Sequence, residues 1–428
     1  MTEAFLQYVW QHKLLEGSLT TTDGAAVVVE HPGTLNRDAG PDFFDARVVI
    51  DGVRWAGNVE IHIKASDWKQ HGHSDDAAYN NVVLHVVYVH DADIVQNDRK
   101  LPTLQLVDNV PDNVWHNYDD LMNSTSANAI ACSSRLAEIP SFLFGLDQER
   151  MAAERLERKA DDVKRMLSQC KGNWEQVCYQ LTARYLGGRI NAFPFELLAK
   201  ITPMAVIAKI KDNLFRVEAL FFGQAGMLQG SFADDYPLAL QKEYNYLSAA
   251  YSLTPMQPHL WKFFRLRPPA FPTLRISQLA ALVASTDNLF SKMLEAQDIA
   301  SLRNLFDVKA SQYWNTHFLF DKPSPDSVHN LGSDLVDIIL INAWIPLLFH
   351  YGVAHGNQKY KDQAFTLLHQ LPSEANRIVR LWKSSGISSN DAADSQALIQ
   401  RYNEYCSRKR CLDCQLAFRL IKNNKVII

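Results

Sequence analysis

The sequence has no long apolar run, no signal-peptide pattern and no strong net charge. No stretch reaches the roughly 20 consecutive apolar residues that a transmembrane helix needs. The first residues, MTEAFLQYVWQHKLLEG, have acids and a histidine where a signal peptide would have a basic start and an apolar core. A net charge of −4 gives no overall attraction to nucleic acid, so such binding would need a local patch. We therefore expect a cytoplasmic protein with no membrane partner.

The sequence also lacks internal repeats, and its pattern changes near residue 115. At 428 residues it is long for a single core. The N-terminal part reads as a helix, three strands, a short polar connection and a buried strand, NVVLHVVYVH, whereas helical periodicity begins at about residue 140. We predict an α/β (α+β) domain with a mixed sheet over residues 1–122, a linker over 123–139, and a large all-α domain over 140–428 with roughly 8 to 11 helices.

The best patterned strand spans residues 53–64, VRWAGNVEIHIK. Apolar and polar residues alternate along it, and successive side chains of a strand point to opposite faces. Glu60, His62 and Lys64 are therefore expected side by side on one face. An acid, an imidazole and an amine in this order indicate either a solvated face or a site.

The layout resembles that of PD-(D/E)XK nucleases, in which a helix and three strands carry a Pro-Asp and a Glu-x-Lys. Pro41-Asp42 takes the first position and Glu60-x-His62 the second, with a histidine in place of the usual lysine. The resemblance implies that Asp42 and Glu60 hold Mg²⁺ or Mn²⁺ against a phosphate, and that His62 or Lys64 assists the attacking water. Glu30, at the end of the first strand, also falls where that superfamily often places an acid.

Further ligand-type residues follow the patterned strand. His62, His71, His73 and Asp75 can form a Zn²⁺ or Mn²⁺ site without reference to any family, because imidazole and carboxylate suit these ions. Such a site would serve a hydrolase acting on something other than nucleic acid. His85, alone in an apolar strand, is expected to be a hydrogen-bonded core residue.

Three of the six cysteines crowd near the C-terminal end, as Cys406, Cys411 and Cys414. Three thiolates in this spacing are one short of a zinc site. Some PD-(D/E)XK exonucleases hold a 4Fe–4S cluster with one distant and three C-terminal cysteines, although their spacing differs. Cys132, Cys170 and Cys178 are the candidates for a fourth ligand. The segment reads as helix, which favours buried free thiols over either metal group.

A basic and aromatic stretch, HLWKFFRLRPPAFPTLRISQLA, lies in the predicted helical domain. Lys262, Arg265, Arg267 and Arg275 are interleaved with aromatic residues, as in channels that bind single-stranded nucleic acid. The alternative is a loop whose aromatic side chains fill the helical core. We favour that alternative.

Several stretches together resemble an uncharacterised bacterial family, domain of unknown function 2851: RDAGPDFFDARV, GNVEIHIKASDW, EALFFGQAG, RPPAFPTLRISQLA and RYNEYCSRKRCLDC. This resemblance implies no activity. Our first hypothesis is a metal-dependent phosphodiesterase acting on nucleic acid through Asp42, Glu60 and His62, with Asp42, Glu60, His71 and His73 as metal ligands. The alternatives are a binding or scaffold protein on a degenerate nuclease-like fold, and the histidine-rich hydrolase.

Overall fold

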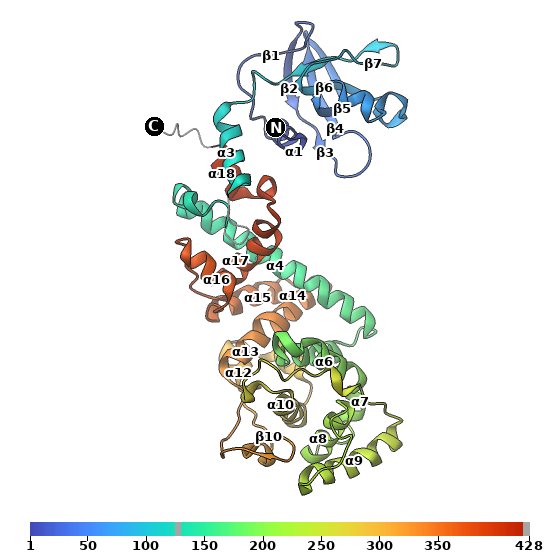
Figure 1. The fold of residues 1–428 in the computed structure, drawn as a ribbon, viewed down its shortest axis with the longest axis vertical. Coiled ribbons are helices and arrows are strands. Elements are labelled where there is room, and N and C mark those ends of the chain that lie inside the picture. Colours follow the sequence, from blue (N-terminus) through green and yellow to red (C-terminus); the bar gives the residue numbers. More distant parts are fainter. Residues whose placement is uncertain (125–129, 423–428) are drawn as a thin grey trace. The chain divides into compact units, whose positions relative to one another are not determined.

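The computed structural model describes residues 1–124 and 130–422 (Figure 1). The chain divides into two compact units. The sheet unit joins Met1–Asp147 with Arg401–Ile428, and the helical unit is Gln148–Gln400. This division differs from the predicted boundaries because the C-terminal segment returns to the sheet unit. Within the predicted linker 123–139, residues 125–129 lie outside the described residues.

The sheet unit begins with the predicted helix and the predicted strands. Its elements before residue 140 are α1 (Glu3–Gln11), β1 (Leu19–Thr20), β2 (Ala26–His31), β3 (Thr34–Leu35), β4 (Phe43–Ile50), β5 (Val53–Lys64), α2 (Asp67–Gln70), two 3₁₀ turns (His73–Asp75 and Ala77–Tyr79), β6 (Val82–Val89), β7 (Val95–Gln96), β8 (Arg99–Lys100), β9 (Thr103–Gln105), α3 (Asp112–Asn123) and η3 (Ser133–Glu138). The order helix, three strands, short connection and buried strand is confirmed by α1, β2, β4, β5 and β6.

The main sheet is mixed and nearly barrel-like. Its strand order is β1-β2-β4-β5-β6-β9, with the short β3 paired to β4. Strands β2, β4 and β5 run antiparallel, whereas β6 is parallel to β5 and β9 is parallel to β6. The two ends of the sheet meet where Thr22 donates its backbone N–H to the Thr103 carbonyl, at 2.8 Å. The predicted mixed sheet is confirmed, and this closure was not foreseen.

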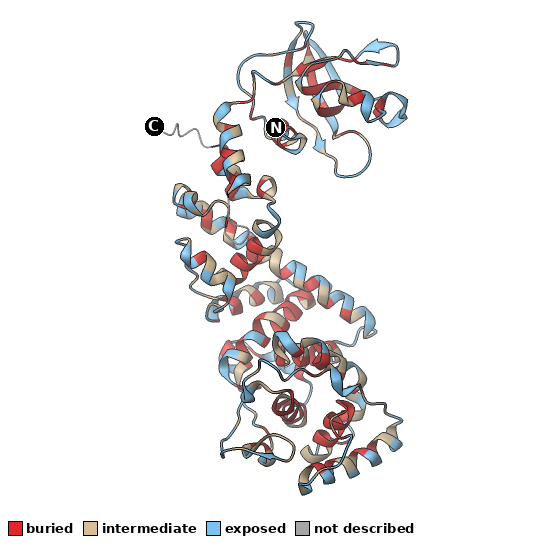
Figure 2. Cartoon of the chain, viewed as in Figure 1, coloured by how far each residue is buried: buried red, intermediate tan, exposed pale blue. Residues whose placement is uncertain are grey.

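The sheet unit has a core on each side of β5. Phe5, Leu6 and Val9 of α1 pack with Val59 and Ile61, the apolar positions of the strand. The opposite face is covered by a smaller apolar group, Trp68 and Tyr79 from the connection after β5, Val82 from β6, and Ile94 and Leu101 from the chain after β6. Within the sheet unit, buried residues gather in α1, β6 and the second half of β5 (Figure 2). Strand β6 is therefore covered on both faces, as predicted.

After residue 140 the described chain is helical, as predicted, but it forms fifteen α-helices rather than 8 to 11. The difference arises because several are only one or two turns long. The helices are α4 (Ser141–Gln169), α5 (Trp174–Leu186), α6 (Gly188–Ile201), α7 (Met204–Ile207), α8 (Leu214–Gln224), α9 (Asp235–Tyr251), α10 (Pro272–Ser285), α11 (Leu289–Glu295), α12 (Ile299–Asn304), α13 (Ser333–Ile339), α14 (Ile345–Ala354), α15 (Gln358–Gln370), α16 (Arg377–Ser384), α17 (Ala392–Glu404) and α18 (Gln415–Lys422). Two short strands, β10 (His317–Leu319) and β11 (Lys322–Pro323), form a hairpin among them.

One helical stretch is long and apolar enough to cross a membrane by length and composition, contrary to the sequence expectation. It spans Ser333–Ala354 and consists of α13, a π-helical turn and α14. Of its most apolar window, 78% is buried inside the protein. Such burial is also typical of a core helix in a folded domain.

Gly57 allows β5 to approach the start of β6. A Cβ atom there would lie 2.4 Å from Val83 Cγ1 and 2.6 Å from the Asn81 carbonyl oxygen, so backbone would have to move. We expect Gly57→Ala to lower the free energy of unfolding by about 1–3 kcal/mol, the usual range for overpacking. Gly145→Ala is the control, because its Cβ would meet nothing within 4 Å. Chemical denaturation of both variants tests this, and equal effects would contradict it.

Candidate metal centre

Strand β5 carries two polar side chains into the interior. Glu60 is 5% exposed and His62 1% exposed, whereas Lys64 at the strand end is exposed. The alternation places these residues on the face covered by the connection after β5, and not on the face that packs against α1. A solvated strand face is therefore the wrong interpretation for Glu60 and His62.

Asp42 and Glu60 are held side by side by reciprocal hydrogen bonds to backbone. The Asp42 N–H donates to Glu60 Oε2 at 3.0 Å, and the Ile61 N–H donates to Asp42 Oδ2 at 3.0 Å. Gln7 of α1 donates its side-chain amide to Asp42 Oδ1 at 2.8 Å. The start of β4 thus brings one carboxylate next to the other, as their spacing in the sequence suggested.

Glu3 is a third acid near this pair, and it was missed from the sequence. It lies in the first turn of α1, one turn before Gln7. Burial raises the pKa of the Glu3 carboxyl, and Glu3 in turn raises the pKa values of Asp42 and Glu60. No sequence signal singled out Glu3, because a pair four residues apart such as Glu3 and Gln7 is ordinary on a helix face. Glu30, by contrast, forms an exposed ion pair with Arg54 at 3.1 Å.

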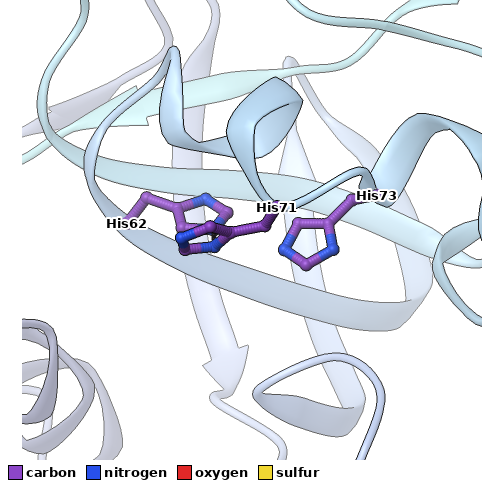
Figure 3. A group of neighbouring side chains, drawn as sticks. All are labelled: His62, His71 and His73. Carbon is purple, nitrogen blue, oxygen red and sulfur yellow. Dashed lines mark hydrogen bonds between the residues drawn. The ribbon is translucent and has the colours of Figure 1, made fainter.

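Three histidines converge next to the carboxylates. His62 comes from β5, His71 ends α2, and His73 begins the following 3₁₀ turn (Figure 3). Each offers a ring nitrogen, and the three nitrogens lie within 4.8 Å of one another. Glu60 Oε1 is 3.5 Å from His62 Nε2 and 3.3 Å from His73 Nε2. Three imidazoles therefore converge, and one carboxylate oxygen lies next to two of them.

His73 supplies the observation that fits a metal ion. Its Nε2 is buried and has no hydrogen-bond partner among the described residues, because its approach to Glu60 lacks hydrogen-bond geometry. The ring is fixed by stacking on Tyr79, with centroids 3.8 Å apart. A buried imidazole nitrogen without a partner is costly in a folded protein. Coordination of a metal would satisfy it.

His85 orients His62 in a way that suits metal binding. His62 Nδ1 and His85 Nε2 are 2.8 Å apart, and His85 is fully buried. If Nδ1 of His62 carries the proton, it donates a hydrogen bond to His85 Nε2. The Nε2 atom of His62 is then left with a free lone pair facing His71 and Glu60. Metal-binding histidines commonly use their other nitrogen in this way. The prediction of a hydrogen-bonded core residue at His85 is confirmed.

Burial in the centre disfavours charge on Glu60 and His62 when no cation is present. Burial raises the pKa of Glu60, and the neighbouring Asp42 carboxylate raises it further. Burial also lowers the pKa of His62 to about 3, with contributions from His73 and His71. Neutral imidazoles bind metals, and a cation would stabilise the deprotonated carboxylates.

Comparison with known families places the chain among proteins without an assigned activity. The family described as protein of unknown function (DUF2851) matches residues 3–377. The chain belongs to this family. No curated protein and no solved structure matches it. The family match contains every residue of the candidate metal centre, from Glu3 to His85, and ends before Cys406.

The remaining predicted site residues lie elsewhere. Lys262, Arg265 and Arg267 are exposed in the helical unit, and Arg275 is half-buried, with Nη1 donating to Gln278 Oε1 at 2.7 Å. Trp261 is buried and donates to a backbone carbonyl, as expected of a loop that fills the core. A nucleic-acid role for the four basic residues stays a prediction.

The C-terminal cysteines belong to the sheet unit but not to this centre. Cys406 and Cys411 begin 3₁₀ turns, η8 (Cys406–Arg408) and η9 (Cys411–Asp413), and Cys414 precedes α18. The predicted continuous helix is therefore wrong here. The chain turns at Lys409, whose φ of 49° is left-handed and ends the first turn.

Proposed function

We propose that this protein is a metal-dependent phosphodiesterase that acts on nucleic acid. The observation that carries the proposal is the convergence of His62, His71 and His73 beside the paired carboxylates of Asp42 and Glu60. Three imidazoles suit a transition metal better than Mg²⁺, so of the two predicted ions Mn²⁺ fits better, and Zn²⁺ fits as well.

Each side chain of the centre has its own role in the proposed reaction. His62, His71 and His73 would hold the metal, with Glu60 Oε1 either joining them or accepting a proton from the attacking water. A bound divalent metal lowers the pKa of water and stabilises charge developing on a phosphate. Asp42, fixed by Gln7 and the Ile61 N–H, keeps Glu60 in position.

The order of the strands supports a phosphodiester as the substrate. A helix, three antiparallel strands and a parallel strand, with acids on the second and third of the antiparallel strands, is the arrangement expected for a PD-(D/E)XK nuclease. Glu3 on the helix adds an acid from the element that precedes the strands. This support is an analogy of fold, and the histidine at position 62 departs from it.

The histidine cluster favours one further candidate, a hydrolase of another ester or amide. A set of three histidines is common in zinc hydrolases, and the usual nuclease lysine is replaced by His62. The two candidates share the centre and the metal, and they differ only in the substrate that is cleaved.

The test is cleavage by the full chain after its bound metal has been quantified. Single- and double-stranded DNA and RNA and a small chromogenic phosphodiester are incubated with Mn²⁺, Zn²⁺ or Mg²⁺. We expect cleavage of a nucleic acid by the wild type and a loss of about 10²–10⁴-fold in Glu60→Gln, the usual effect of removing a general base. Glu30→Gln is the matched control, because Glu30 is an acid of the same sheet outside the centre.

Each outcome separates the candidates. Cleavage that is lost in Glu60→Gln and kept in Glu30→Gln supports the phosphodiesterase. Hydrolysis of other esters, with nucleic acid left intact, supports the second candidate. An absence of both bound metal and cleavage would reject both enzymes and leave the binding or scaffold role.

A further inference from the structure

Helix α8 of the helical unit carries an acid in a segment that is enclosed on all sides. Every residue from Val217 to Gln224 is buried, and most of them are apolar. Glu218 belongs to this segment and is only 1% exposed. A buried carboxyl group costs free energy unless its charge is paired or its proton is retained. The groups around Glu218 therefore decide what this carboxyl can do.

Hydroxyl groups hold the Glu218 carboxyl in place. Ser277 of α10 donates its hydroxyl to Glu218 Oε1 at 2.5 Å, and Tyr236 of α9 donates to Oε2 at 2.7 Å. The Ser311 N–H donates to the Ser277 hydroxyl at 3.0 Å, and the hydroxyls of Ser311 and Tyr236 lie 3.2 Å apart. All of these partners are neutral. The network fixes the carboxyl group but supplies no counter-charge.

Glu218 also lines a cavity of about 640 Å³, a size typical of ligand pockets. The walls come from the start of α8, from α9, from the 3₁₀ turn η6 (Gln312–Asn315) and from the chain after it. They include Phe215, Tyr236, Tyr313 and the exposed Asp326. Among the described residues that line the cavity, none is basic. The cavity therefore combines aromatic rings with two carboxyl groups.

The aromatic wall is fixed by stacking and lies next to further acids. Tyr236 stacks on Tyr313, with centroids 4.4 Å apart, and Tyr313 stacks on His317, with centroids 4.1 Å apart. The Tyr313 hydroxyl donates to Asp234 Oδ2 at 2.7 Å and accepts the Asp321 N–H at 3.1 Å. The protein itself thus engages this hydroxyl. What Tyr313 offers a ligand is its ring, with the negative charge of Asp234 nearby.

These surroundings favour a positively charged ligand. Burial raises the pKa of the Glu218 carboxyl, and the hydrogen bonds from Ser277 and Tyr236 oppose this rise without cancelling it. A cation in the cavity would supply the missing counter-charge and favour the ionised carboxylate. Aromatic rings also attract cations, more strongly where water is excluded. An anion, by contrast, would meet two acids and no basic side chain.

We propose that this cavity binds a small organic cation, with an ammonium or guanidinium group against Glu218 and the attached chain along Phe215, Tyr236 and Tyr313. A carboxylate has about four acceptor sites, so Glu218 can accept from the cation and keep both hydroxyl donors. Asp326 is placed to meet a second positive group, which favours a diamine or polyamine. The cavity belongs to the helical unit, and the histidine centre belongs to the sheet unit.

Binding of defined cations to the full chain tests the proposal. Putrescine, spermidine and agmatine are titrated by calorimetry, and 1,4-butanediol serves as an uncharged probe of the same chain length as putrescine. We expect the cations to bind and to raise the melting temperature, and the diol to do neither at the same concentration. Glu218→Gln keeps the shape of the side chain and removes its charge. It should weaken binding of the cations by at least about tenfold.

The control variant is Glu175→Gln. Glu175 is another partly buried acid of the helical unit, and burial raises its pKa as well. Its Oε2 accepts the Phe290 N–H at 2.9 Å, and it does not line the cavity. We expect this variant to bind the cations as the wild type does. Asp326→Asn, at an exposed position, should weaken spermidine binding by about two- to fivefold, the usual effect of losing an exposed ion pair.

Several results would overturn the proposal. These are binding of the diol as tight as that of putrescine, binding of none of the three cations, and cation binding that survives in Glu218→Gln. Equal losses in Glu218→Gln and Glu175→Gln would likewise show that the cavity is not the site. If Glu218→Gln does not fold, the diol comparison on the wild type and the Asp326→Asn variant decide instead. Cleavage of nucleic acid enters none of these readouts, so the two proposals stand or fail separately.

Discussion

Replacing His62 with alanine should reduce the affinity of the candidate centre for Mn²⁺ or Zn²⁺ by at least about 100-fold, and hydrolysis should fall with it. His62 offers its Nε2 beside His71 at 3.2 Å and lies 3.5 Å from Glu60. Loss of a single outer partner of a metal ligand already costs about 10–100-fold. Removal of a central ligand should cost more, and calorimetric titration of metal into the metal-free protein measures it.

The control for this substitution is His31→Ala. His31 lies on β2, is exposed, and accepts a hydrogen bond from the Gly33 N–H, so the substitution removes an imidazole from the same sheet without touching the centre. We expect metal binding within twofold of the wild type. His62→Ala protein that is folded by circular dichroism and still binds metal with wild-type affinity would show that the three histidines do not form the site.

The arrangement of the N-terminal strands could be predicted because local patterns encode it. Alternation in residues 53–64 and the doubly apolar run in β6 each specify a strand and its burial. The closure of the sheet could not be predicted, since it depends on β1 and β9, which are two and three residues long. The C-terminal segment from Arg401 belongs to the sheet unit through tertiary contacts, which local sequence patterns do not predict.

The site was predicted in its strand residues and missed in its helix residue. Glu60 and His62 follow from the strand pattern, Asp42 was implied by the resemblance to PD-(D/E)XK nucleases, and the two following histidines were candidates by residue type. Glu3 has an apolar helix around it and no distinctive spacing, so only the packing of α1 against β5 reveals it. Lys64 lies on the same face of β5 as His62, as expected, but it is exposed because it is the last residue of the strand.

The structure of the segment around the C-terminal cysteines could not be predicted either. The helical interpretation of the C-terminal segment rested on the spacing of its apolar residues. The spacing of apolar residues carries no information about a left-handed residue such as Lys409. This residue divides the segment into two short turns. Of the three other cysteines, Cys132 lies in the same unit as the C-terminal three, whereas Cys170 and Cys178 lie in the helical unit.

Metal binding at the histidine centre should strengthen as pH rises from about 6 to about 8. Burial raises the pKa of Asp42 to about 6 and that of Glu60 to about 8, so without metal the folded protein holds protons that the unfolded chain releases. The stability that these carboxyls contribute is complete below their unfolded values and is lost as pH rises through the folded ones. A cation that binds the deprotonated form competes with these protons.

The size of this effect follows from the number of protons displaced. Release of one proton from Glu60 makes metal affinity rise by up to about tenfold per pH unit below the folded pKa of Glu60. At saturating metal this adds about 1.4 kcal/mol to the free energy of unfolding for each pH unit. His62 and His85 contribute no charge change in this range, because burial lowers their pKa values to about 3. The metal-induced rise in melting temperature should therefore grow steadily between about pH 6 and about pH 8.

Glu60→Gln isolates the cause of this pH dependence. The glutamine keeps the shape of the side chain and removes the proton, so any remaining metal-induced rise in melting temperature should vary much less with pH. Asp42 would contribute only near the lower end of the range, where its pKa of about 6 lies. A wild-type response that is flat with pH would mean that Glu60 binds no proton that the metal must displace. In that case the metal either meets a Glu60 carboxylate that is already charged or binds away from it, and the proposed proton competition is wrong.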